Sequence, residues 1–247
     1  VVRHQRNFLR QPVWIVFALT QPMFWLLLYS QLFRRIVDLP GFDGQSYVQF
    51  LAPGVVVMTS FFGATWSGMA TLEDLDRGVL QRFLATPVRR VSLIASHVIH
   101  NAIISILQTI IILGLSWCLG ARVERGVVGW LLIVLVGALV AASFSAISHG
   151  LALIVRREET LIAALNFFGL PLTFMSAILI AESLMPTWMQ WVARFNPIHW
   201  SVIAARELSE SSTDWSTVGI YLGLLIAFVA GTTLLATRAF GAFRKTL

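Results

Sequence analysis

Histidine and serine side chains are the groups of this sequence whose types and spacing could support chemistry. His97 and His100 lie one helical turn apart, as two ligands of one metal ion would, but no carboxylate lies close to them. Ser145, Ser148 and His149 could supply a nucleophile and its base. The same residue types also pack apolar helices together through interhelical hydrogen bonds. The sequence therefore favours packing over a metal or catalytic site, and an intramembrane enzyme remains an alternative.

Residues for binding a nucleotide are missing from the printed sequence. It contains no Gly-x-x-x-x-Gly-Lys-Ser/Thr loop, and its one lysine, Lys245, stands near the C-terminal end. We therefore expect that this chain holds no cofactor and does not hydrolyse ATP by itself. The single cysteine, Cys118, excludes an internal disulfide and a cysteine-rich metal site.

Long apolar stretches make up most of the sequence and carry the histidine and serine side chains discussed above. Of the 247 residues, 57% are hydrophobic and 12% are charged, and the mean hydropathy is +0.78. Globular chains carry about 25% charged residues. Crossing about 30 Å of hydrocarbon takes about 20 apolar residues in a helix. The sequence predicts an all-α polytopic membrane protein, one transmembrane domain over 1–247, with six transmembrane helices at 13–33, 50–70, 92–118, 127–155, 161–181 and 218–239.

Basic residues set the predicted orientation, because loops rich in Lys and Arg tend to stay cytoplasmic. Twelve Lys and Arg fall on the side of the N-terminus and six fall on the other side. We therefore expect a multi-pass protein of the cytoplasmic membrane with both termini in the cytoplasm. The net charge of +6 then reflects topology, and no basic groove with stacking aromatics points to nucleic acid.

The charged residues of the predicted spans bear on the energy source. These spans contain no Asp or Glu, and Arg238 is their one charged side chain. A proton- or sodium-coupled carrier keeps an Asp or Glu inside the membrane as its ion relay. The sequence therefore predicts that energy comes from a separate component.

A short amphipathic helix is predicted in the cytoplasmic loop 71–90. Thr71 and Asp74 have the spacing of a capping box, and acidic residues precede basic ones, as the helix dipole favours. Apolar residues recur there at helical spacing, and Pro87 ends the helix. Such a helix could dock into a soluble partner or lie on anionic lipid.

Residues 182–216 are predicted to form an extracytoplasmic region with two short re-entrant helices in the outer leaflet. Pro186 suits a first helical turn, and Asn196 with Pro197 separates the two helices. Trp188 and Trp191 share one stripe and are typical of an aromatic belt at the membrane surface. The region is either an interfacial anchor or a gate at the outer end of a pathway.

The chain resembles the membrane subunits of type-2 ABC exporters, which include permeases of the daunorubicin-resistance type. The matching pieces are 78–87 (GVLQRFLATP) after the second span and 195–200 (FNPIHW), followed by Ala205 and Arg206, before the last span. An amphipathic N-terminal segment, 1–12, and the six-span layout extend the resemblance over essentially the whole chain. It implies a dimer of permease subunits, identical or not, with two copies of an ABC ATPase that bind ATP and Mg, all in membrane lipid.

The resemblance also implies roles for particular residues. The loop 76–86 would be the coupling helix that enters the ATPase, with the contact residues Asp76, Arg77, Gly78, Leu80, Gln81, Arg82, Phe83, Thr86 and Pro87. Many members of the family carry an acid where this chain has Gln81. The outer gate would consist of Trp188, Trp191, Phe195, Asn196, Pro197, Trp200 and Arg206.

A pathway for the substrate is expected among aromatic, methionine and amide side chains of the spans. These residues could equally face lipid or the core: Met58, Phe61, Phe62, Trp66, Asn166, Phe167, Phe168 and Phe174. We expect a permease that exports an amphipathic compound such as a drug, antibiotic or lipid-like molecule, and that is not itself an enzyme. A permease for a lipid-linked glycan is the alternative within transport. An intramembrane enzyme and a membrane scaffold are alternatives from other functional classes.

The predicted topology can be tested by labelling single cysteines in a Cys118→Ser background. Gln81→Cys should resist an impermeant maleimide added outside intact cells and react after the membrane is opened, because the basic loop stays inside. Leu184→Cys serves as the control on the opposite side. Labelling of position 81 from outside would reject this orientation.

Overall fold

The chain folds into a helical bundle in the computed structural model, which describes residues 12–32, 46–77, 90–210 and 212–243, with side chains for 20–32, 46–77, 95–210 and 212–241. The elements are α2 (Pro12–Leu32), α3 (Tyr47–Thr65), η2 (Trp66–Gly68), α4 (Met69–Asp76), α6 (Arg90–Cys118), α7 (Gly126–Val155), α8 (Glu158–Phe174), η3 (Glu182–Leu184), α9 (Thr187–Ala193), α10 (Pro197–Glu207) and α11 (Trp215–Phe243). The described ranges contain helices and no strand, so the all-α class is confirmed.

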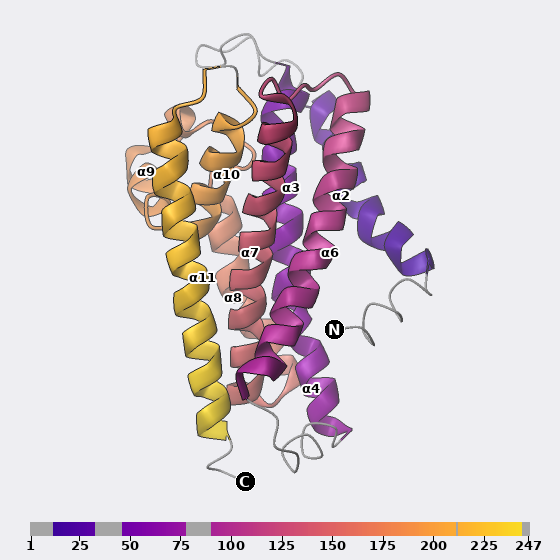
Figure 1. Ribbon diagram of the computed structural model, residues 1–247, viewed down its shortest axis with the longest axis vertical. Helices are drawn as coiled ribbons and strands as arrows, with labels where there is room; N and C mark the ends of the chain where they lie inside the picture. The colour runs from indigo at the N-terminus through magenta and orange to yellow at the C-terminus, as the bar shows by residue number, and fades with distance from the viewer. Residues whose placement is uncertain (1–11, 33–45, 78–89, 211, 244–247) are drawn as a thin grey trace.

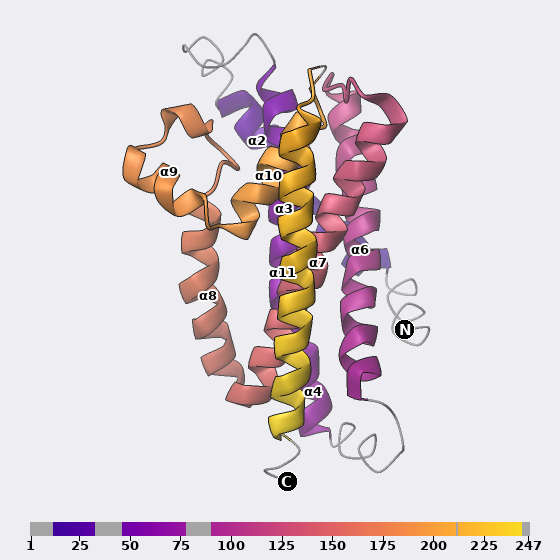
Figure 2. The same cartoon turned by 60° about the vertical axis from the view of Figure 1, so that its left-hand side comes forward.

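Helix α7 lies at the centre of the bundle, and α3, α6 and α11 pack along it (Figures 1 and 2). Its buried face is rich in Ala, Ser and Gly, which let neighbouring backbones approach closely. A Cβ added at Gly150 would stand only 3.2 Å from the Cα of Ala236 on α11. The apolar core joins α3 to α7 through fully buried Val55 and Ile133. The most apolar helix therefore packs against three of the other long helices.

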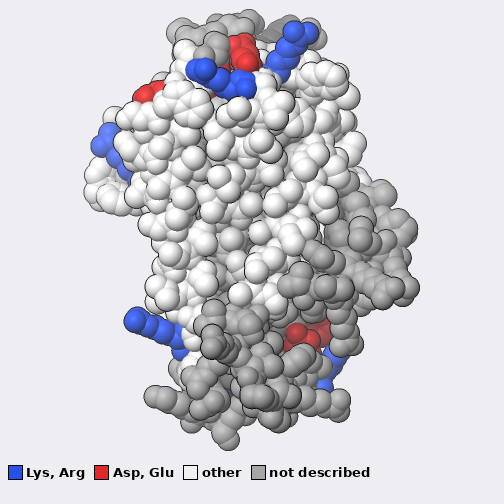
Figure 3. Space-filling view, in the orientation of Figure 1, with Lys and Arg blue, Asp and Glu red and all other residues white. Residues whose placement is uncertain are grey.

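Helices long and apolar enough to cross a membrane account for much of the chain. The part that the structure describes contains four such stretches, Tyr47–Asp76, Ala95–Cys118, Gly126–Val155 and Trp215–Gly241. On the face shown in Figure 3, acidic and basic side chains gather near the two ends, and a broad uncharged band separates them. This distribution suits a protein that passes through the membrane several times.

The connections between helices alternate between the two ends of the bundle. The end of α4, the start of α6, the turn from α7 to α8 and the end of α11 lie together at the bottom of Figures 1 and 2. The described parts of the predicted cytoplasmic segments 71–90, 156–160 and 240–247 thus lie at one end. Of the predicted cytoplasmic segment 1–12 the structure describes only Pro12, and the side of the membrane that this end faces stays a prediction.

Helix α8 is shorter than the predicted span 161–181. It begins at Glu158 and ends at Phe174 after 17 residues, and residues 175–181 are turns and bends. The helix ends there because other groups take its last carbonyls: the side-chain amide of Asn196 donates to the carbonyls of Leu172, at 2.7 Å, and Met175, at 3.0 Å. The Ser176 hydroxyl donates to the Thr173 carbonyl at 2.6 Å.

The predicted helix start at Thr71 is wrong. Thr71 lies inside α4, whose N-cap is Gly68, and α4 continues from α3 through the 3₁₀ turn η2. Its hydroxyl lies 2.6 Å from Nδ1 of His149 on α7, so it does not cap a backbone amide. The segment Tyr47–Asp76 is therefore one long, slightly interrupted helix of 30 residues.

The two short helices predicted after α8 are present as α9 and α10. Asn196 is the N-cap of α10, and its Oδ1 accepts a hydrogen bond from the Ile198 amide at 3.0 Å, with Pro197 in the first turn. The predicted break at Asn196 and Pro197 is confirmed. The depth of these helices in a membrane is not tested.

Asn196→Ala should lower the stability of the protein. The variant loses the cap of α10 and leaves two carbonyls of the α8 end without their donor, which we expect to cost about 2–4 kcal/mol. Thermal unfolding in detergent, followed by tryptophan fluorescence, measures the effect. Asn166→Ala is the matched control, because its exposed amide donates only to Ile162 within α8. Equal melting temperatures for the two variants would contradict the role assigned to Asn196.

Candidate functional site

An apolar groove runs between α8 and the rest of the bundle, and we call it the α8 groove. Its deeper part is a cavity of about 340 Å³ lined by side chains of α3, α7, α8, α10 and α11. Its outer part, of about 620 Å³, lies between α8 and α9. Phe168, Leu172 and Phe195 line both parts, so the two parts adjoin at these side chains. Figure 2 shows α8 standing beside the bundle, with α9 at its outer end.

Half of the predicted pathway residues line this groove. Asn166, Phe167 and Phe168 line the outer part, and Phe61 and Phe168 line the deeper part. The other four, Met58, Phe62, Trp66 and Phe174, do not line either cavity. Met58 and Phe62 pack against the core, Trp66 lies in η2, and Phe174 is exposed at the end of α8.

Sequence reasoning missed the walls that α7 and α11 contribute. Phe144 and Ile147 of α7 and Phe228 of α11 line the deeper cavity, and the Phe144 ring meets that of Phe61 edge-on with centroids 4.6 Å apart. No local signal marks these residues, because they face the groove only through the way α8 packs beside α7. In the sequence, only the aromatic type of Phe144 and Phe228 suggested a place in a binding groove.

The chemistry of the α8 groove follows from its lining. No ionisable side chain lines either cavity within the described part of the chain. Phenylalanine, leucine and proline dominate, and the polar groups include the amides of Asn166 and Asn196 and the Thr65 hydroxyl. The Thr65 hydroxyl already donates to the Phe61 carbonyl at 2.7 Å. The groove can therefore bind an apolar body with few polar groups, and it offers no partner for a buried charge.

Arg206 of α10 fastens the outer end of the bundle. Its guanidinium donates to the carbonyls of Phe50, at 3.3 Å, Ile178, at 3.1 Å, and Ala177, and it lies 3.5 Å from the centroid of the Phe50 ring. Burial lowers the pKa of Arg206 to about 9, so the group stays charged at neutral pH. One side chain thereby ties α10 to the start of α3 and to the non-helical segment after α8.

The aromatic residues of the predicted gate point outward. Trp188, Trp191 and Phe195 are each more than half exposed, and the last two rings meet edge-on at 5.5 Å. Trp200 is partly buried, and its indole N–H donates to the Arg194 carbonyl at 2.7 Å. Phe195 also lines both parts of the α8 groove, whereas Trp188 and Trp191 line neither, and the gate stays a prediction.

The serine and histidine side chains considered for catalysis form hydrogen bonds between helices. Ser145 accepts from the Asn101 amide of α6 at 2.9 Å, and Ser148 donates to the Thr65 carbonyl at 2.5 Å. His149 meets Thr71, so it does not pair with either serine. No group of three potential metal ligands occurs in the described residues. The arrangement indicates helix packing.

The predicted coupling residues are only partly described. Asp76 ends α4, and Arg77 follows it with an ion pair to Glu73. Both partners of this pair are well exposed, so it contributes little to stability. The remaining contact residues, from Gly78 to Pro87, lie outside the described residues, as does the N-terminal segment apart from Pro12.

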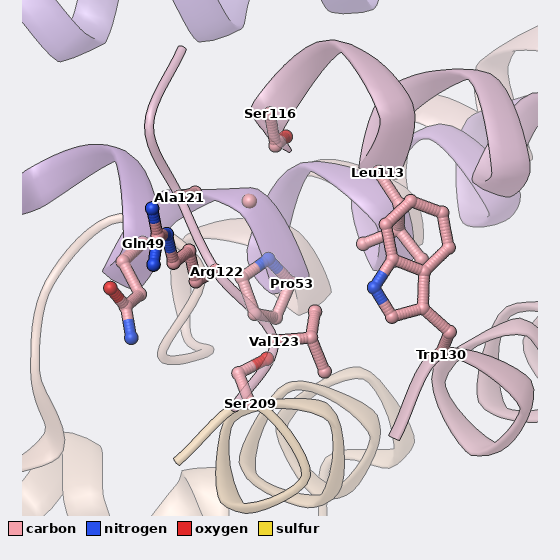
Figure 4. A pocket seen from close by; sticks show the side chains of 10 residues that line it. Gln49, Pro53, Leu113, Ser116, Ala121, Arg122, Val123, Trp130 and Ser209 are labelled. Atoms are coloured by element: carbon pink, nitrogen blue, oxygen red, sulfur yellow. The ribbon is translucent and has the colours of Figure 1, made fainter. Parts of the chain in front are cut away.

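A separate small cavity lies at the outer end, between α3, the end of α6 and the connection to α7 (Figure 4). Gln49, Ser116, Arg122 and Ser209 line it together with apolar side chains. Its volume of about 10 Å³ admits at most one water molecule. It is therefore too small for a substrate.

Comparisons with known proteins give the family of this helical bundle. Residues 1–208 match the family model described as ABC-2 type transporter. The chain belongs to this family. The resemblance noted in the sequence is thereby confirmed.

Individual relatives carry the names of transport proteins. The chain is 31% identical to the putative transport permease ycf38 of Porphyra purpurea, over 86% of this chain and 74% of that protein. It is 28% identical to the daunorubicin resistance ABC transporter permease protein DrrB1 of Streptomyces coeruleorubidus, over 92% and 80%. It is 24% identical to the inner membrane transport permease YadH of Escherichia coli K12, over 86% and 80%.

Arg206→Gln should loosen the outer end of the bundle. The shorter neutral side chain leaves buried carbonyls without a charged donor, and we expect a loss of stability of about 3 kcal/mol or more. Thermal unfolding and the rate of proteolysis within 175–196 report the change. Arg194→Gln makes the same substitution at an exposed arginine and should leave both unchanged. Resistance of the Arg206→Gln segment to protease would contradict this role.

Proposed function

We propose that this chain is the permease subunit of an ATP-driven exporter that moves amphipathic compounds outward across the cytoplasmic membrane. The observation that carries the proposal is the α8 groove, which is large, apolar and without ionisable lining residues in a chain of the ABC-2 type transporter family. The name of the relative from Streptomyces coeruleorubidus supports a drug-like substrate. ATP and Mg would bind to a separate ATPase, present in two copies.

The form of the groove supports a dimer. Phe167, Phe168 and Phe174 lie on α8 with most of their side-chain surface exposed, and the outer part of the groove is open on that side. A second permease subunit, identical or related, would close the groove between two α8 helices and shield these rings. The same proposal includes six membrane spans, in which α2 and α8 are added to the four long apolar helices. It also places both termini in the cytoplasm.

A permease for a lipid-linked glycan is the second candidate. The apolar lining suits a lipid tail as well as a drug. A glycan would also need polar side chains along its path, and the cavities offer mainly phenylalanine, leucine and proline. We therefore place the amphipathic drug first.

Transport by the assembled complex tests the function. The chain should copurify with an ABC ATPase from the same source, and inside-out vesicles of the complex should take up daunorubicin when ATP is supplied. A substitution in the Walker lysine of that ATPase is the control and should stop uptake. Uptake without ATP, or the absence of any associated ATPase, would reject the proposal. Uptake of a lipid-linked glycan in place of the drug would favour the second candidate.

Charge reversal at the end of α4 tests the coupling site. Arg77→Glu with Arg82→Glu should reduce copurification of the ATPase about tenfold or more, because complementary charges steer and hold such contacts. Arg122→Glu with Arg194→Glu changes the net charge equally at the opposite end and should leave copurification intact. Folding and membrane insertion should be normal in both. Full binding and uptake with the first pair would move the contact to the turn between α7 and α8.

A further inference from the structure

The junction between α3 and α4 is held by α7. The turn η2 interrupts the helical hydrogen bonds there, since the Met69 amide turns to Trp66 and Ser67 and not to the Thr65 carbonyl. Ser148 of α7 forms a hydrogen bond at each end of this turn. Its hydroxyl donates to the Thr65 carbonyl at 2.5 Å and accepts from the Gly68 amide at 3.0 Å. A side chain of α7 thus adds hydrogen bonds to the backbone between α3 and α4, where the α-helix is interrupted.

The two backbones meet closely at this point. A Cβ added at Gly68 would stand 2.4 Å from the Ser148 hydroxyl oxygen and 2.6 Å from the Ser148 carbonyl oxygen. The carbonyl cannot move aside without shifting α7. Gly63, five residues earlier, has a Gln108 side-chain atom at 3.7 Å as its sole close neighbour. The backbone-to-backbone contact at Gly68 is therefore not shared by Gly63, one and a half turns away on the same helix.

Further hydrogen bonds surround Ser148 on both sides. Ser67 and Ser145 meet with hydroxyl oxygens 3.3 Å apart, and Asn101 of α6 donates to Ser145. One turn further along, the Thr71 hydroxyl meets His149 Nδ1 at 2.6 Å. We call this set of contacts, from Ser67, Gly68 and Thr71 to Ser145, Ser148 and His149, the inner clamp.

Apolar packing continues the contact along α4. Leu72 is buried in a cluster with Ala152 of α7 and Leu161 of α8. The face of α4 opposite to its exposed Glu73 and Arg77 is thus fixed to the end of α7 and the beginning of α8.

We propose that Ser148 and Gly68 are positioning residues that make α4 and the inner half of α7 move as one body. The inference rests on the proposed function, in which the segment after α4 receives the movement of the ATPase. With the inner clamp closed, that movement reaches α7 directly, and from α7 it reaches α6 and α11, which pack along its length. The competing arrangement is a hinge at η2 that opens in each cycle.

Hydrogen–deuterium exchange of the complete complex tests the transfer. Exchange is compared between the nucleotide-free complex and the complex trapped with ATP and vanadate. In the wild type, trapping should change exchange both in α4 and in residues 145–155. In Ser148→Ala the change in α7 should be lost while ATPase binding persists. Gly68→Ala should have the same effect.

Matched controls exist for both variants. Ser143→Ala removes a buried hydroxyl of α7 that donates only to Leu139 of its own helix, and Gly63→Ala adds the same methyl group to α3 without a clash. Both should respond to trapping like the wild type. A general weakening of the fold would alter exchange in the absence of nucleotide and in the controls too. An unchanged α7 response in Ser148→Ala and Gly68→Ala would overturn the inference.

A disulfide cross-link distinguishes an inner clamp that stays closed from a hinge at η2 that opens in each cycle. Ser67→Cys with Ser145→Cys, in a Cys118→Ser background, replaces two touching hydroxyls by a disulfide. If α4 and α7 move together, the oxidised complex should hydrolyse ATP as fast as the reduced one. Arrest on oxidation, relieved by a reductant, would establish the hinge and overturn the inference. If no ATPase associates with the wild-type chain, the proposed function is rejected, and the inference that rests on it is rejected too. This result is distinguishable from the two cross-linking outcomes, because both of those require a complex that hydrolyses ATP.

Discussion

Every break in a helix of this bundle exposes backbone groups that lipid cannot satisfy, and this constraint explains the placement of its polar side chains. Ser148 adds hydrogen bonds to the backbone at η2, Asn196 takes the last carbonyls of α8, and Arg206 takes two carbonyls of the segment that follows. Each of these residues comes from an element far away in the sequence. The irregular parts of the fold are therefore held by side chains of other elements.

The closely packed helices around α7 and the loosely packed helix α8 differ in what they contribute to the structure. Small residues on α7 let α3, α6 and α11 approach closely, and the deeper cavity lies where α8 meets α3, α7 and α11. Helix α8 meets the bundle through bulkier rings and leaves the α8 groove beside it. Fastening by Asn196 and Arg206 keeps α8 and α10 in place although α8 itself is largely exposed. A cavity next to a rigid core is the arrangement that a binding site requires.

The sequence predicted the long helices well and the irregular joints poorly. The predicted spans 92–118 and 127–155 lie within two residues of α6 and α7, because long apolar runs decide such helices locally. Helix α11 begins at Trp215 and not at 218, since Asp214 caps it by accepting hydrogen bonds from Thr217 and Ser216, which also lower the pKa of the Asp214 carboxyl. The end of α8 and the role of Thr71 depend on partners more than 20 residues away. The groove residues Phe144 and Phe228 were missed for the same reason.

The length of Tyr47–Asp76 has a geometric consequence. Thirty helical residues measure about 45 Å at about 1.5 Å each, whereas the hydrocarbon layer is about 30 Å thick. About 15 Å of this rod therefore exceeds the hydrocarbon thickness, to be divided between its two ends. The exposed ion pair of Glu73 and Arg77 stands at one of these ends, so the excess length places it where water and a soluble protein can reach it.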